Sequence, residues 1–184
     1  MLDDSILNGF IEMGRDIFLR GLISSHAGNM SVRMNNEIYI TRRGSMLGRL
    51  KPADMIEVDM DDPNDMNISR ASTEYVVHQA IYMVTDAKAI IHTHPPYATL
   101  LSFSGELVPV DAEGLYYFKR IPVVFPRNPI GSLECAELVC EELDENRIVL
   151  VRGHGSFALG ATLEEAFKLT TSLESSAFYL YHLK

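Results

Sequence analysis

Two histidines at the end of an apolar segment give the first sign of chemistry. In "AIIHTHPPYATL", His92 and His94 are separated by one residue and followed by Pro95 and Pro96. In an extended strand, residues i and i+2 point to the same face, so the two imidazoles project side by side. Two prolines cannot continue the hydrogen-bond ladder, which places the pair at an accessible strand end. The pattern indicates either a metal site or two structural histidines.

A third histidine favours the metal. His154 lies in "VRGHGSFALG" between two glycines, where two apolar segments meet. Glycines let the backbone approach another group closely, although they also make ordinary turns. Three neutral imidazoles plus one open position make a catalytic zinc site rather than a closed structural one. We therefore take His92, His94 and His154 as candidate ligands for zinc; cobalt, nickel and manganese remain alternatives.

The other three histidines give weaker signals. His78 follows Glu74 by four residues on the same predicted helix face, and we expect a structural role for it. His26 precedes "AGNMSVR" in a loop that can approach a site, and His182 is expected at a helix end near the surface.

Glu74 is the candidate acid or base. It follows Ser72 and Thr73 in "ASTEYVVHQAIY", at the predicted start of a helix. The unpaired backbone N–H groups of a first helical turn, together with two hydroxyls, form a receptacle for phosphate. The alternative is an ordinary capping carboxylate.

Two glycine-containing loops could complete an anion site. One is "HAGNMSVR", where a glycine permits close approach and an amide can donate; the other is "ITRRGSMLG", which adds guanidinium groups. Each loop alone also fits an ordinary turn. Together with the helix start at Ser72 and Thr73, the loops offer Gly28, Asn29, Arg42, Arg43, Gly44 and Ser45 as candidate anion-binding residues.

Changes in hydrophobic period predict the elements that position these residues. We expect helices over residues 6–22, 72–84, 96–103, 132–143 and 162–183, the second capped by Ser69, Ser72 or Thr73 and the last by a Thr162–Glu165 capping box. We expect a hairpin within residues 29–41 that turns at Asn35-Asn36, and strands over 54–60, 88–94, 121–125, 147–153 and 156–160. Short turns between strand pairs indicate an α/β protein with a mixed or antiparallel sheet between helices.

Composition limits the class of protein. The 184 residues, 47% hydrophobic and 22% charged, predict a single soluble domain over residues 1–184. The acidic start, unlike a basic leader, indicates a cytoplasmic protein. A net charge of -9 argues against nucleic acid or an anionic membrane as partner. Cys135 and Cys140, five residues apart in a predicted helix, are expected to be reduced thiols.

The segments "AGNMSVR", "STE", "IIHTHPPYA" and "GHGSFALG", in this order, resemble the class II aldolase/adducin family over about residues 5 to 182. The resemblance implies a three-layer α/β/α sandwich with a mainly antiparallel sheet, and a homotetramer with active sites between subunits. It implies that His92, His94 and His154 bind Zn2+ and that Glu74 is the catalytic acid/base. It also narrows the residues that would hold a small phosphorylated sugar to Gly28, Asn29, Gly44, Ser72 and Thr73, with Arg43 beside them. The implied reaction is reversible cleavage of a ketose 1-phosphate to dihydroxyacetone phosphate and a short aldehyde such as lactaldehyde.

The chain departs from the family's aldolase pattern at three places. Arg43 stands where the aldolases have a threonine that contacts phosphate. Glu113 stands where they have an interface tyrosine, although Tyr116 and Tyr117 lie close by. The sequence also stops at Lys184, before the tail that supplies a further tyrosine there. These departures leave the aldehyde and its stereochemistry open.

Other members of the family give the alternative functions. Epimerases, dehydratases and decarboxylases of sugar phosphates resemble this chain in the same metal ligands. The adducin branch is a non-catalytic interaction module that has lost those ligands, whereas this sequence keeps all three histidines and Glu74.

Overall fold

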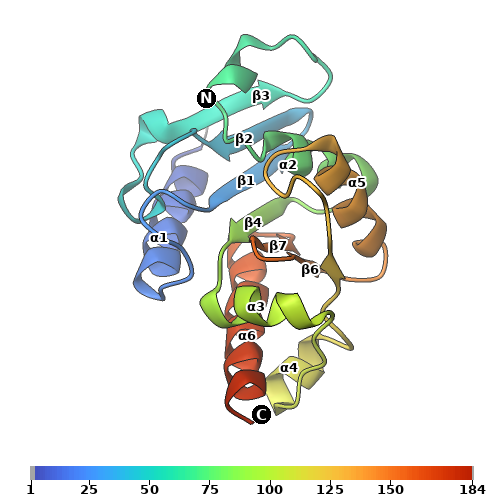
Figure 1. Cartoon of the computed structure of the whole chain (residues 1–184). Helices are drawn as coiled ribbons and strands as arrows, with labels where there is room; N and C mark the ends of the chain where they lie inside the picture. Colours follow the sequence, from blue (N-terminus) through green and yellow to red (C-terminus); the bar gives the residue numbers. More distant parts are fainter. Residues whose placement is uncertain (1–2, 184) are drawn as a thin grey trace.

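A seven-stranded sheet forms the centre of the computed structural model, which describes residues 3–183 (Figure 1). The strand order is β3-β2-β1-β4-β7-β6-β5, and every neighbouring pair is antiparallel except β5 with β6. The prediction of a mainly antiparallel sheet is confirmed. The strands are β1 Asn29–Met34, β2 Glu37–Thr41, β3 Met55–Asp59, β4 Ala89–Thr93, β5 Val123–Val124, β6 Ile148–Val151 and β7 Gly155–Gly160.

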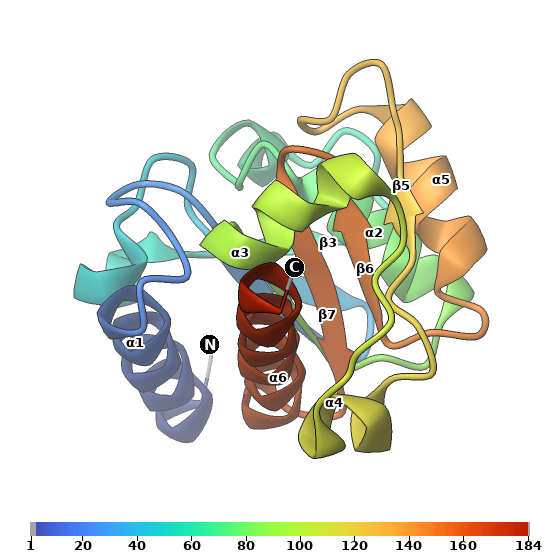
Figure 2. The same ribbon diagram turned by 60° about the horizontal axis from the view of Figure 1, so that its bottom comes forward.

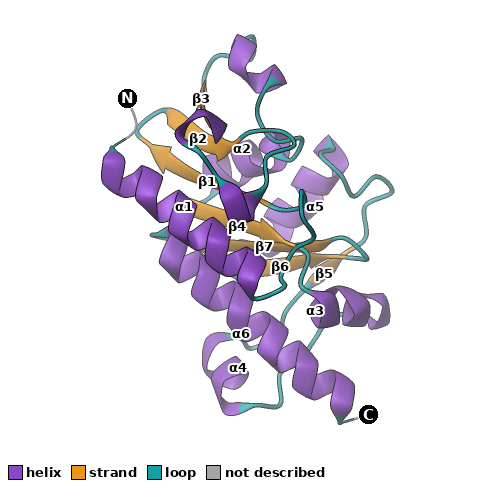
Figure 3. Ribbon diagram, turned by 90° about the vertical axis from the view of Figure 1, so that its left-hand side faces the viewer, coloured by secondary structure: helices purple, strands orange, loops and turns teal. Residues whose placement is uncertain are grey.

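Helices cover both faces of the sheet, as expected for a three-layer α/β/α sandwich. Helices α1 and α6 lie side by side on one face, where α3 and α4 pack against α6; α2 and α5 lie on the other face (Figures 2 and 3). The helices are α1 Asp4–Leu19, α2 Tyr75–Val84, α3 Pro96–Leu101, α4 Ala112–Tyr117, α5 Leu133–Glu142 and α6 Leu163–His182.

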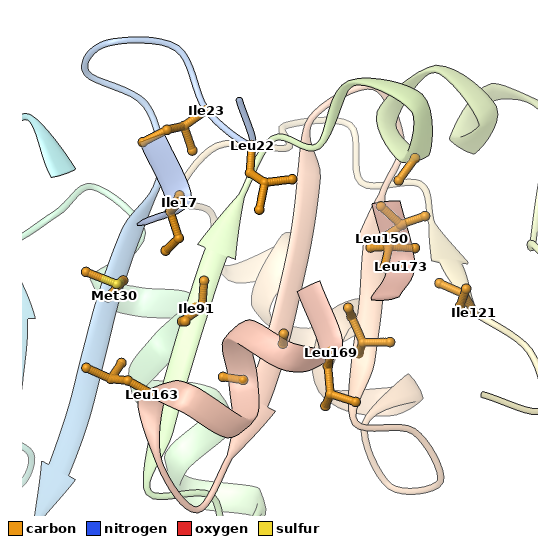
Figure 4. Packing of buried hydrophobic residues seen from close by; sticks show 14 of the residues in the cluster. Ile17, Leu22, Ile23, Met30, Ile91, Ile121, Leu150, Leu163, Leu169 and Leu173 are labelled. Carbon is orange, nitrogen blue, oxygen red and sulfur yellow. The ribbon is translucent and has the colours of Figure 1, made fainter. Parts of the chain in front are cut away.

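Both faces of the central strands are apolar because both are buried. In β4, Ile91 belongs to the cluster beneath α1 and α6, whereas Ile90 belongs to the cluster beneath α2 and α5. Figure 4 shows Ile91 in the first cluster with Leu169 and Leu173 of α6. His92 shares the parity of Ile90 and so points to the α2 side of the sheet.

Local sequence signals explain several element ends. Asn35 has φ 54° in the turn between β1 and β2, a left-handed conformation that Asn tolerates, and the predicted hairpin is confirmed. Thr162 caps α6 by accepting a hydrogen bond from the Glu165 backbone N–H. The Glu165 carboxylate, however, accepts from the Ala161 N–H at 2.8 Å, so the predicted capping box is completed one residue earlier.

Other predictions of local structure were wrong. Helix α2 starts at Tyr75 with Glu74 at the N-cap position, not Ser69, Ser72 or Thr73, although the Ser72 hydroxyl accepts a hydrogen bond from the Glu74 N–H. Strand β5 has two residues instead of five, and no helix was expected at α4, where the Asp111 carboxylate accepts from the Gly114 N–H.

Within residues 3–183, every helix is too short or too polar to cross a bilayer.

Gly155 allows β7 to start directly against the end of β4. A Cβ at this position would lie 2.1 Å from the Thr93 carbonyl oxygen and 2.8 Å from His94 Cδ2. We expect Gly155→Ala to lower the free energy of unfolding by about 1–3 kcal/mol, because the strands must separate. Urea unfolding of the metal-free protein measures this. Gly9→Ala is the control: its Cβ would contact nothing within 4 Å, and in helix α1 it should stabilise by about 0.5–1 kcal/mol. A Gly155→Ala protein of wild-type stability would contradict the close approach.

Candidate active site

Antiparallel pairing brings distant segments to one end of the sheet. His92 near the end of β4 lies opposite Asn29, the first residue of β1, and opposite Phe157 near the start of β7. Since β2 runs antiparallel to β1, the loop after Thr41 emerges at the same end. The turn that precedes β7 carries His154 to this end as well.

The three histidines converge there. The Nε2 atoms of His92 and His94 are 3.0 Å apart, and the His154 ring centroid lies 4.7 Å from that of His92 and 4.8 Å from that of His94. One potential ligand atom from each of the three lies within 4.8 Å of the others. Strand β4 ends at Thr93, so His94 lies one residue beyond it, yet the two imidazoles lie side by side as predicted.

The chemistry of these donors fits a divalent transition metal. His92 Nδ1 lies 3.0 Å from the Ser156 carbonyl oxygen, to which it donates, so its Nε2 lone pair is free for a metal. Burial lowers the pKa of all three imidazoles: that of His92 lies well below its usual range, that of His94 is about 4, and that of His154 is also lowered. Metal ligation requires neutral imidazole, which these side chains supply at neutral pH.

Buried side chains pack against the His92 ring and are joined to one another by contacts and hydrogen bonds. Its ring stacks on Phe157 with centroids 4.2 Å apart, and Phe157 contacts His78 edge-on at 5.8 Å. His78 Nδ1 lies 2.6 Å from the Ser31 hydroxyl, which also lies 2.8 Å from the Tyr82 hydroxyl. His78 is therefore structural, as expected, and its contacts fix the wall against which His92 packs.

Glu74 points into the same site from the start of α2. It is 4% exposed; its Oε1 lies 3.8 Å from His154 Nε2, and its Oε2 accepts the Gly131 N–H at 3.2 Å. Burial raises the pKa of Glu74 to about 7, and the Gly131 hydrogen bond opposes the shift. Because burial also lowers the pKa of His154, we treat the contact between them as one of a carboxyl group with a neutral imidazole, not an ion pair.

The ten residues given a role with the family resemblance all line one cavity of about 190 Å³. Backbone hydrogen bonds join the loop at Arg43 and Gly44 to the segment that precedes α2. The Arg43 N–H donates to the Arg70 carbonyl at 2.9 Å, and the Ser72 N–H donates to the Thr41 carbonyl at 3.1 Å. The cavity is lined by Gly28, Asn29, Arg43, Gly44, Ser72, Thr73, Glu74, His92, His94 and His154, together with His26, Ala27, Arg42, Ser45 and Ile130.

Sequence reasoning missed the loop between β5 and α5. Ile130 lines the cavity, and the neighbouring Gly131 donates to Glu74. A Cβ on Gly131 would lie 2.4 Å from the Thr73 carbonyl oxygen, so only glycine permits this close approach. The available signal was a Pro- and Gly-containing loop, "PRNPIGS", between a strand and a helix.

The three residues considered for the interface tyrosine's place lie on α4, outside this cavity. Glu113 accepts a hydrogen bond from the Ser172 hydroxyl of α6 at 2.8 Å, and Tyr116 is 82% exposed. Tyr117 contacts the Tyr116 ring edge-on with centroids 5.1 Å apart.

Known proteins share both the sequence and the fold. The model of the class II aldolase and adducin N-terminal domain matches residues 8–181. An L-fuculose phosphate aldolase from Methanocaldococcus jannaschii is 34% identical over 170 residues, which cover 91% of each chain. A 3-oxo-tetronate 4-phosphate decarboxylase from Haemophilus influenzae is 32% identical over 95% of this chain and 86% of that protein. The crystal structure of L-fuculose-1-phosphate aldolase from Thermus thermophilus has a TM-score of 0.92 and 41% identity, covering 98% of this chain and 95% of the other.

These relatives define a class of proteins that includes lyases acting on sugar phosphates. This chain belongs to the class II aldolase and adducin family, and the resemblance drawn from its motifs is confirmed.

The histidine cluster makes a prediction about metal binding. We expect metal-free protein to take up one zinc ion per chain, and His94→Ala to weaken zinc binding by about 100-fold or more, since losing a ligand should cost at least as much as losing a ligand's supporting partner. A competition titration with a chromogenic chelator measures the affinity. His182→Ala removes an exposed imidazole at the far end of α6 whose Nδ1 hydrogen-bonds to the Phe178 carbonyl, and it should bind zinc normally. Wild-type affinity in His94→Ala would contradict the ligand assignment.

The raised pKa of Glu74 makes a prediction about stability and pH in the metal-free protein. With a pKa of about 7 folded and about 4.5 unfolded, the folded state binds more protons between these values, so stability is lost as pH rises through this window. Glu74→Gln removes this loss. Its advantage over wild type should grow by up to about 3 kcal/mol between about pH 5 and about pH 8.

Urea unfolding at both pH values tests this expectation. Glu137→Gln, at an exposed position on α5, is the control and should show no such growth. A pH-independent difference between Glu74→Gln and wild type would mean that the buried carboxyl does not take up its proton in this range.

Proposed function

We propose that this protein is a zinc-dependent aldolase that reversibly cleaves a ketose 1-phosphate into dihydroxyacetone phosphate and a short aldehyde such as lactaldehyde. The observation that carries the proposal is the shared cavity, where three neutral imidazoles and the Glu74 carboxyl group adjoin the loops at Gly28 and Gly44. The aldolase name of the M. jannaschii and T. thermophilus relatives supports it.

Each group in the cavity has a separate task. His92, His94 and His154 would hold the divalent ion, which supplies a Lewis acid that polarises the substrate carbonyl. In the condensation direction, the Glu74 carboxylate accepts the proton that leaves a C–H bond of dihydroxyacetone phosphate, and in cleavage its carboxylic acid returns that proton. A pKa of about 7 suits this task, because both protonation states are populated near neutral pH.

The Gly131 N–H restricts how Glu74 acts. It holds Oε2 at 3.2 Å, while Oε1 faces His154. Oε1 is therefore the oxygen that we assign to proton transfer, with Oε2 fixing the orientation of the carboxyl group.

The phosphate group of the substrate would bind on the other side of the cavity. The backbone N–H of Gly44, the side-chain amide of Asn29, and the hydroxyls of Ser72 and Thr73 are the proposed donors. The Arg43 side chain forms no hydrogen bond or ion pair within residues 3–183, so its guanidinium is available to the phosphate.

A decarboxylase of a phosphorylated sugar acid is the second candidate, and Arg43 favours it. A guanidinium that has no partner within residues 3–183, beside the proposed phosphate site, suits a substrate that carries a carboxylate as well as a phosphate. The H. influenzae relative with the decarboxylase name is nearly as similar as the aldolase relatives.

We further propose a homotetramer with the active sites at the subunit interfaces. Large apolar side chains exposed on this chain support an assembly: Phe103 is 58% exposed, Phe125 52% and Ile130 54%. The Arg152 guanidinium lies 5.4 Å from the Phe103 ring centroid and 5.2 Å from that of Phe125, which joins the two rings into one surface next to His154.

Solvent exchange tests the aldolase without knowledge of the aldehyde. Zinc-loaded protein in D₂O should replace one C–H hydrogen of dihydroxyacetone phosphate stereospecifically, as followed by NMR. Glu74→Gln should lose this exchange by at least about 100-fold while keeping its zinc, because the proton acceptor is gone.

Two comparisons make the result decisive. Glu137→Gln should exchange at the wild-type rate, since its side chain lies on the exposed surface of α5. If the fully zinc-loaded wild type does not exchange, the aldolase proposal fails, and release of carbon dioxide from a 3-oxo-tetronate 4-phosphate becomes the expected activity.

A further inference from the structure

Asp54 and Arg42 form an ion pair next to the loop at Arg43 and Gly44. Asp54 is 8% exposed and ends a short 3₁₀ turn, Pro52–Asp54, before β3. Its Oδ1 accepts from Arg42 Nε at 3.0 Å and from Arg42 Nη2 at 2.8 Å, while its Oδ2 accepts from the Lys51 N–H at 3.0 Å. The backbones pair as well, since the Arg42 N–H donates to the Asp54 carbonyl at 2.7 Å. The carboxylate is thus fully engaged by its surroundings.

Arg42 also forms hydrogen bonds with other residues of the loop. Its Nη1 donates to the Arg43 carbonyl at 3.3 Å, and its own carbonyl accepts from the Ser45 N–H at 3.0 Å. Gly44, with φ 71°, makes the turn between them. The Arg42 guanidinium therefore ties the peptide units of the loop to a fixed carboxylate at the edge of the sheet.

The ion pair between Asp54 and Arg42 also distinguishes the two neighbouring arginines, Arg42 and Arg43. The Arg42 guanidinium is committed to Asp54, so its charge is balanced, whereas Arg43 next to it has no such partner within residues 3–183. The two adjacent arginines therefore have different roles. Arg42 holds the loop in place, whereas the Arg43 side chain is available to a ligand.

We infer that Asp54 is a positioning residue for phosphate binding, acting through Arg42 to hold the Arg43–Gly44 loop in the conformation that receives the anion. The inference rests on the phosphate-binding role given to this loop in the proposed function. It assigns to Asp54 and Arg42 no contact with the reacting atoms.

The inference predicts the opposite sign from simple electrostatics. Removing a carboxylate near an anion site raises the local positive potential and should tighten anion binding. If Asp54 instead organises the loop, removing its charge weakens anion binding, because the loop donors are no longer held in place.

The test is calorimetric titration of the zinc-loaded protein with inorganic phosphate, for Asp54→Asn, Arg42→Lys and the double variant. Arg42→Lys keeps the positive charge and loses the planar fork that engages Asp54. We expect each single variant to bind phosphate about tenfold more weakly, the size of one charged hydrogen bond. The double variant should bind as weakly as either single variant, because both act through the same contact.

Glu165→Gln is the matched control. It breaks another arginine–carboxylate pair, Arg147 with Glu165 at 2.8 Å, which lines a different cavity. This variant should bind phosphate as wild type does. Zinc content and urea unfolding of each variant show whether a change reflects the loop or the whole fold.

Several results would overturn the inference. These are unchanged or tighter phosphate binding in Asp54→Asn, unchanged binding in Arg42→Lys, additive losses in the double variant, or no phosphate binding by the wild type. If Asp54→Asn does not fold, Arg42→Lys decides the question, because its side chain is 43% exposed and its charge is retained. Phosphate binding needs no turnover, so normal phosphate results with no deuterium exchange would reject the aldolase reaction and leave the role of Asp54 intact.

Discussion

The register of β4 between β1 and β7 is the constraint on which the rest of the site depends. It sets His92 opposite Asn29 on one side and opposite Phe157 on the other. A slip of one residue would turn His92 to the face covered by α1 and α6, away from Glu74. A slip in one direction would put Ala89 where Ile90 packs, and a slip in the other would bury the His92 imidazole where Ile91 packs, so core packing opposes both. Packing of the apolar core thus fixes the distance between the candidate metal ligands and the candidate phosphate loops.

Burial of this site also sets its electrostatics. The same loss of solvent lowers the pKa of the imidazoles and raises that of Glu74, so the interior holds neutral donors and a carboxyl group that titrates near neutral pH. Although the chain has a net charge of -9, the cavity is not acidic, since Arg43 lines it and its positive charge has no ion-pair partner within residues 3–183. An anionic ligand and a metal cation can therefore share a cavity in an acidic protein.

Local sequence patterns correctly predicted the features that neighbouring residues determine. They failed for the features that contacts between distant segments determine. Alternation and Asn35 specified the hairpin, and strand periodicity predicted His92 beside His94 although His94 lies one residue past β4. The start of α2 was wrong because the Ser72 N–H is paired with the Thr41 carbonyl of β2, which holds Ser72 outside the helix. Gly131 and Asp54 carried no recognisable motif, since each acts through a partner distant in sequence, Glu74 and Arg42 respectively.

One fold can serve several reactions if the sheet positions the shared groups of the site and side chains on the loops differ between proteins. The M. jannaschii and H. influenzae relatives carry different reaction names at 34% and 32% identity, so overall similarity does not separate these reactions. Under the proposed function, the candidate metal ligands at the strand ends and the candidate phosphate loop would suit any sugar phosphate that loses a bond next to a carbonyl group. Under the proposed function, the groups that would distinguish these substrates are the side chains of Ile130 on the loop before α5 and of Arg43, whose guanidinium has no partner within residues 3–183. Each acts through its side chain, which can change without disturbing the backbone register that assembles the site.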